Sequence, residues 1–154
     1  MHMEGFRQFY ESKVDNEVEE SLKKLPAGHR ALIKDYKFKF ENGVNLKGYP
    51  DSIGVIHLGN TNKKLIKVAA PWRHSREFAM LHEVAHRIYE KIMTKKLRKK
   101  WSKLLKTVKL HKDAAKEKNE EELFCHHYSQ YYCVNKVIRY DHDKLDDFIK
   151  KLPS

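Results

Sequence analysis

One stretch of the chain, His82-Glu83-Val84-Ala85-His86, has a definite chemical meaning as a His-Glu-x-x-His pattern. Two histidines four residues apart on a helix lie about 40° apart around its axis, so both imidazoles face one side and can bind one Zn²⁺. Glu83 lies beside them, within reach of a metal-bound water. Zinc lowers the pKa of its water towards about 7, and the glutamate can accept the released proton. The pattern therefore predicts His82 and His86 as metal ligands and Glu83 as the general base for peptide hydrolysis.

The surrounding residues predict a helix over residues 75–93 that carries this pattern. Ser75 is a suitable N-cap and Glu77 lies in the first turn. Apolar residues recur at helical spacing along the segment at Phe78, Leu81, Ala85, Ile88 and Ile92. The histidines thus lie beside an apolar stripe, which disfavours the alternative of a surface helix without a metal.

A catalytic zinc usually has three protein ligands and a water, so one more ligand must come from elsewhere. No His-x-x-Gly-x-x-His continuation follows His86, which excludes the metzincin arrangement. A second helix is expected to begin at Asn119, and the apolar spacing of the residues after it puts Glu122 at the edge of the core. We therefore expect Glu122 to be the third ligand.

Other roles remain open for the residues near Glu122. The glutamates of this first turn can instead cap the helix with Asn119 and stabilise its dipole, which is the role expected for Glu120 and Glu121. Cys125, one turn further, is an alternative ligand, although a buried structural thiol is the preferred interpretation.

These two segments, His82–His86 and Glu122–Tyr128, resemble the gluzincin-type peptidases related to the anthrax lethal factor catalytic domain, which include small phage-encoded members and secreted Pro-Pro endopeptidases. The resemblance extends over about residues 48–132. It implies a compact α+β zincin-like domain, with a small antiparallel sheet packed on the active-site helix and further helices after it. It also implies a zinc-dependent endopeptidase with one Zn²⁺ per chain, and it matches Glu122 to the family's zinc-binding glutamate.

The sequence departs from this family at two positions. His126 replaces an acidic residue that supports the metal ligands, and Ala115 replaces a tyrosine that stabilises the oxyanion. His111 is our candidate for the oxyanion role, with His126 and Tyr132 as alternatives. Each has a non-catalytic alternative. His111 can belong to a solvated basic helix, His126 can be a buried imidazole with satisfied hydrogen bonds, and Tyr132 can pack in the core.

We interpret residues 1–154 as a single domain. Its predicted parts are an N-terminal helix over 1–25 ended by Pro26-Ala27-Gly28, a small sheet within 30–70, the helix at 75–93, and helices within 95–152. Alternating residues predict a strand at 36–40. Residues 53–58 and 64–69 flank a turn-forming segment and predict a β-hairpin. The substrate peptide is expected to pair with the outer arm, 53–58, as an added strand.

The chain has 32 Lys and Arg against 21 Asp and Glu, a formal net charge of +11. Such a field favours anionic partners, so we expect acidic residues near the scissile bond. The alternative function is a nucleic-acid-associated protein with a structural or inactive zinc site, in which the lysine-rich segment 95–112 binds phosphates.

The sequence shows no secretion signal and no apolar run of about 20 residues, so we expect a cytoplasmic or otherwise intracellular protein without membrane insertion; a phage or mobile-element origin agrees with the resemblance. Cys125 and Cys133 lie eight residues apart on one helix, about 12 Å by helical rise, and cannot form a disulfide with each other. Trp101 is expected in the core. The histidines without ligand spacing are expected at the surface: His2, His29, His57, His74 and His142.

Overall fold

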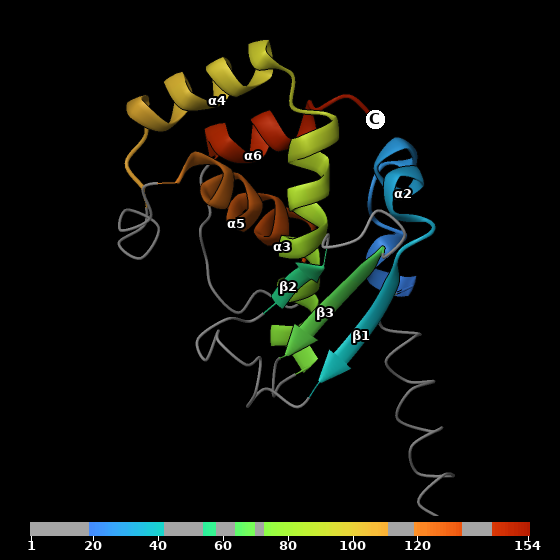
Figure 1. Cartoon of the computed structure of the whole chain (residues 1–154). Helices are drawn as coiled ribbons and strands as arrows, with labels where there is room; N and C mark the ends of the chain where they lie inside the picture. The colour runs from blue at the N-terminus through green and yellow to red at the C-terminus, as the bar shows by residue number, and fades with distance from the viewer. Residues whose placement is uncertain (1–18, 42–53, 58–63, 70–72, 111–118, 134–142) are drawn as a thin grey trace, which may run out of the picture.

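Helices make up most of the described chain, and a three-stranded sheet lies against the longest of them (Figure 1). The computed structural model describes residues 19–41, 54–57, 64–69, 73–110, 119–133 and 143–154. The helices are α2 (Ala27–Ile33), α3 (Arg73–Lys91), α4 (Lys95–Thr107), α5 (Glu120–Tyr132) and α6 (Asp143–Lys150). The strands are β1 (Lys37–Glu41), β2 (Gly54–His57) and β3 (Leu65–Ala69).

The predicted helices at 75–93 and within 95–152 correspond to α3 through α6, and the α+β character of the chain is confirmed. Asn119 is the N-cap of α5, as predicted. Ser75 is not the N-cap of α3, because the helix begins two residues earlier, at Arg73. The predicted N-terminal helix is helical at residues 19–22, and its earlier part lies outside the described residues.

The sheet has the order β1-β3-β2 and is mixed. The predicted hairpin partners β2 and β3 pair antiparallel, with Ile56 opposite Ile66. β1 pairs parallel to β3, with Phe38 opposite Ile66, so the prediction of a purely antiparallel sheet is wrong for this strand. The alternation that predicts a strand does not encode the direction of its neighbour. Here β2 occupies the far edge and β3 returns between the two, which leaves β1 and β3 parallel.

Residues 27–33 form a helix. The sequence instead predicts that the N-terminal helix ends at Pro26-Ala27-Gly28 and that the sheet region begins at residue 30. Pro26 occupies the N-cap with φ −54°, a value that suits entry into a helix. Gly28 follows, and a Cβ there would lie 2.3 Å from the backbone carbon of Ser154. Only glycine therefore allows the C-terminal residues to pack on α2, which Figure 1 shows beside that end of the chain.

His29 is fully buried, which contradicts its predicted surface position. Its Nε2 lies 2.7 Å from the carbonyl oxygen of Pro153 and must donate, while the Tyr128 hydroxyl, 2.8 Å from Nδ1, donates to the other nitrogen. Burial lowers the pKa of His29, which agrees with this neutral tautomer. The imidazole thus joins α2, α5 and the C-terminal segment.

The core lies between α3, α5 and the sheet. Helices α4 and α6 pack against α5 and against each other (Figure 1). Trp101 of α4 is fully buried, as predicted, and its Nε1 donates to the Glu120 carbonyl at the start of α5. Ile66 and Val68, on one face of β3, are also fully buried. No helix in the described part of the chain is long and apolar enough to cross a membrane.

Candidate metal centre

Helix α3 presents the predicted metal-binding pattern at the margin of its buried face. Leu81, Ala85 and Ile88 are fully buried, while the side chains of His82 and His86 are 13% and 16% exposed. The helix therefore holds both imidazoles firmly and leaves one side of each accessible.

Helix α5 lies across from this face; its own N-cap orders its first turn, and a hydrogen bond near its far end joins it to α3. At its start, the Asn119 carboxamide oxygen accepts hydrogen bonds from the backbone nitrogens of Glu121 and Glu122, at 2.9 and 3.1 Å. Two turns later, the buried Ser129 hydroxyl donates to the Phe78 carbonyl of α3 at 2.8 Å. The cap thus orders the first turn of α5, while the Ser129–Phe78 hydrogen bond fixes the helix against α3.

The Glu122 carboxylate bridges the two imidazoles. Its Oε2 lies 2.9 Å from Nε2 of His82, and its Oε1 lies 3.1 Å from Nε2 of His86. The structure thus brings the three predicted ligands together through two imidazole nitrogens and a carboxylate. This is the donor set of catalytic zinc sites with two histidines and a glutamate.

Glu121 has a role that the sequence did not predict. Its Oε2 lies 2.7 Å from Nδ1 of His86, so the nitrogen donates and the carboxylate accepts. Carboxylates that bind the far nitrogen of a ligand histidine fix the ring orientation and raise its basicity. The available signal was the second glutamate beside Glu122, since a ligand histidine needs a partner for its other nitrogen.

The charges of this cluster are strongly coupled. Burial alone lowers the pKa of His86, but hydrogen bonds with Glu122 and Glu121 outweigh that effect and raise it to about 9. Hydrogen bonds from His82 and His86 hold the pKa of Glu122 well below its usual range. A metal must therefore compete with a proton on His86, because a ligand imidazole is neutral.

Glu83 is only 6% exposed and lies on the same helix as the two histidines. Burial raises the pKa of its carboxyl group, and the nearby His82 and His86 act in the opposite direction. A carboxylate with a raised pKa is better suited to accept a proton near neutral pH, as a general base does.

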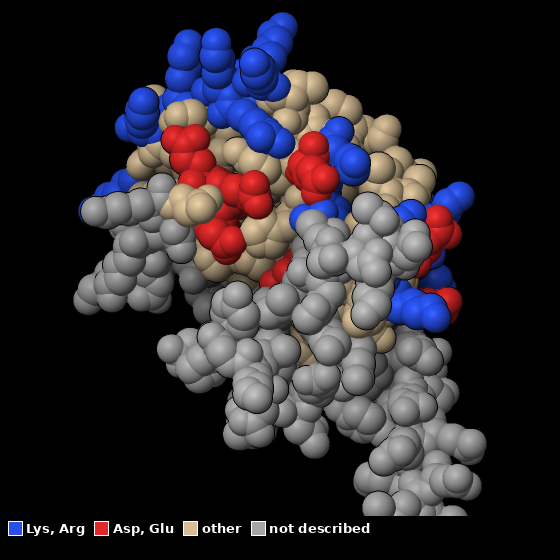
Figure 2. All heavy atoms as spheres, in the orientation of Figure 1, with Lys and Arg blue, Asp and Glu red and all other residues tan. Residues whose placement is uncertain are grey.

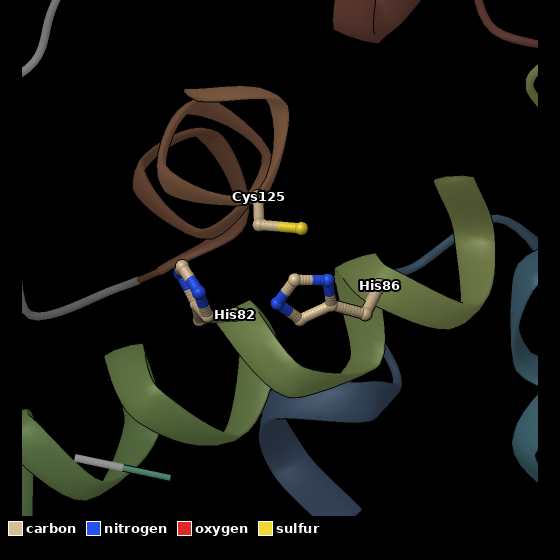
Figure 3. Close-up of side chains that lie close together, drawn as sticks. All are labelled: His82, His86 and Cys125. Carbon is tan, nitrogen blue, oxygen red and sulfur yellow. The ribbon is translucent and has the colours of Figure 1, made fainter. Parts of the chain in front are cut away.

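Two more potential metal ligands, Cys125 and His126, lie near His82. The Cys125 sulfur and nitrogens of His82 and His86 all lie within 4.8 Å of one another, and Figure 3 shows Cys125 on α5, opposite the two imidazoles of α3. Ligand atoms of His82, Glu122 and His126 form a second group of this size. Cys125 is fully buried, and burial raises the pKa of its thiol well above the usual value.

The three candidates for the oxyanion role differ in what the structure shows of their position relative to the metal ligands. His111 and Ala115 lie outside them. Tyr132 is ten residues after Glu122 on α5, about 15 Å along the axis, and packs against Tyr128 with ring centroids 4.8 Å apart. Of the two described candidates, His126 lies near the site, with its ring centroid 4.7 Å from that of His82.

Comparison of the chain with protein-family models, with curated proteins and with solved structures found no match. The interpretation of the site therefore depends on its side chains. Two imidazoles, a bridging carboxylate and an adjacent buried glutamate can bind a divalent metal and handle a proton beside it.

Proposed function

We propose that the protein is a zinc-dependent endopeptidase with a zincin-like arrangement, in which His82, His86 and Glu122 bind one Zn²⁺. The observation that carries this proposal is the Glu122 carboxylate, which meets Nε2 of both histidines at 2.9 and 3.1 Å. The three residues come from two helices, and their types and spacing in the sequence predict all three as ligands. Their donor atoms are those that zinc prefers.

The chain's own groups would divide the chemistry as follows. Bound Zn²⁺ would supply Lewis acidity to the scissile carbonyl and to a water. Glu83 takes the proton of the attacking water on its carboxylate and passes it to the leaving amine nitrogen. Glu121 holds the His86 ring by its Nδ1 so that Nε2 faces Glu122. His111 remains our candidate for stabilising the oxyanion.

The peptide substrate would bind along β2, which is an edge strand of the described sheet and contacts α3. An extended peptide can form backbone hydrogen bonds with such an edge and present alternate side chains to pockets. The preference for acidic residues near the scissile bond stays a prediction. The carboxylates of the first turn of α5 gather on the surface in Figure 2, below the lysines of α4, and would oppose it.

The proposed peptidase activity is tested by replacing the general base while leaving the metal ligands intact. Glu83→Gln keeps the size of the side chain and removes the proton acceptor, so the rate of cleavage of a mixed peptide library should fall by about 10²- to 10⁴-fold. Zinc content, measured on the same samples, should equal that of the wild type. Equal cleavage by both proteins would contradict the mechanism.

A second candidate function is supported by the surface of α4. This helix has six exposed lysines and no acidic residue, and its Trp101 points into the core. Figure 2 shows the basic side chains gathered along this edge of the molecule. Such a ridge suits the phosphates of a nucleic acid, and binding of that kind weakens steeply as salt rises. In this case the metal site would be structural.

A further inference from the structure

The metal centre contains a thiol that the proposed peptidase does not use. Cys125 lies three residues after Glu122 on α5, so the two side chains project from the same side of that helix. Its sulfur and nitrogens of both ligand histidines lie within 4.8 Å of one another. Figure 3 shows Cys125 on α5, opposite the two imidazoles of α3.

We propose that Cys125 is an additional protein ligand of the metal held by His82, His86 and Glu122. This inference rests on the metal site of the proposed function, not on its catalysis. Cys125 would bind as a thiolate, and its proton would pass to solvent when the metal binds. Thiolate is a strong ligand for zinc and for related divalent metals.

The consequence concerns access of water to the metal. Two imidazoles, one carboxylate and one thiolate are four protein donors, which is the usual number in a closed zinc site. A catalytic site keeps one position for water, so Cys125 would compete with the water that Glu83 activates. The thiolate would thus hold the enzyme in a closed resting state, and the enzyme would turn over when this ligand leaves.

The chain provides a matched control in its other cysteine. Cys133 is also buried and is not in a disulfide, and it is the C-cap at the far end of the same helix. Eight residues of helix separate it from Cys125, about 12 Å along the axis, so it lies beyond reach of the same metal. Because the chain has only these two cysteines, a Cys133→Ala variant retains Cys125 as its only thiol.

Cobalt substitution of the full-length chain gives a readout that does not depend on activity. Thiolate bound to Co²⁺ produces a charge-transfer absorption in the near ultraviolet, which imidazole and carboxylate ligands do not. The wild type and Cys133→Ala should both show this band when titrated with Co²⁺. Cys125→Ala and Cys125→Ser should lose it, while the visible bands of bound cobalt persist.

The outcomes separate this inference from the peptidase proposal. If the wild type and Cys133→Ala bind cobalt without the near-ultraviolet band, Cys125 is not a ligand, even if a Cys125 variant fails to fold. Glu83-dependent proteolysis would then still stand. A band that depends on Cys125, together with no Glu83-dependent proteolysis even in the Cys125→Ala background, would support the thiolate ligand and contradict the peptidase. A chain that binds neither cobalt nor zinc would overturn both.

Discussion

The carboxylates at the start of α5 and the lysines of α4 are neighbouring groups of opposite charge that are held in different ways (Figure 2). Glu121 and Glu122 form hydrogen bonds to two histidines of another helix, at distances between 2.7 and 3.1 Å. The α4 lysines extend into solvent on flexible side chains. Fixed donors of several kinds can select one metal ion, whereas a row of solvated like charges attracts anions with little selectivity. This contrast favours the α3–α5 junction over α4 as the place of the proposed metal chemistry.

Zinc affinity should be sensitive to the loss of the negative charge on Glu121 alone. Glu121→Gln removes the charge that accepts from Nδ1 of His86 and retains the shape of the side chain, so zinc affinity should fall by about 10- to 100-fold. A competition titration with a chelator measures it. Glu120→Gln is the matched control, because that exposed neighbour contacts Ser102 instead, and unchanged affinity in both variants would contradict the role of Glu121.

The same cluster should make the stability of the metal-free chain depend on pH. The pKa of His86 is about 9 in the folded chain and 6.5 for an unperturbed histidine. Because the folded value is raised, its contribution to stability is fully present below pH 6.5 and is lost as the pH rises through about 9. Urea unfolding across this range measures the loss. Glu121→Gln should reduce the slope, and an unchanged slope would show that the ion pairs do not form.

The α4 lysines should give the smallest effect on the fold. Replacing Lys99 and Lys103 by glutamate changes two exposed residues, so the free energy of unfolding should move by no more than about 0.5 kcal/mol per site, and zinc binding should stay the same. If α4 binds nucleic acid, the variant should bind a labelled oligonucleotide more weakly and with a smaller dependence on salt. Equal binding at low salt would remove the second candidate function.

The parts of the fold that were predictable from the sequence depend on local patterns. The apolar spacing of α3 and the capping by Asn119 are such patterns, and they place His82, His86 and Glu122 on two helices. Other features depend on residues far apart in the chain. His29 is buried because Tyr128 and Pro153, 99 and 124 residues away, satisfy its nitrogens.

The same limit applies to the sheet and to the metal centre. The parallel pairing of β1 with β3 follows from the path of the chain through the far edge strand, which alternation cannot encode. The apolar spacing after Asn119 favours Glu122 over Glu121 as the ligand, but the hydrogen bond of Glu121 with Nδ1 of His86 depends on the position of α3, which local spacing does not encode.

Glu122 is the residue proposed to complete a zinc site with His82 and His86. Isothermal titration of zinc into the full-length wild type, Glu122→Ala and Glu120→Ala tests it directly. We expect one zinc per chain for the wild type and for Glu120→Ala, because Glu120 faces Ser102 and solvent. Glu122→Ala should lose high-affinity binding, since it removes one of the three proposed ligands. Stoichiometric binding by a folded Glu122→Ala at wild-type affinity would contradict the assignment.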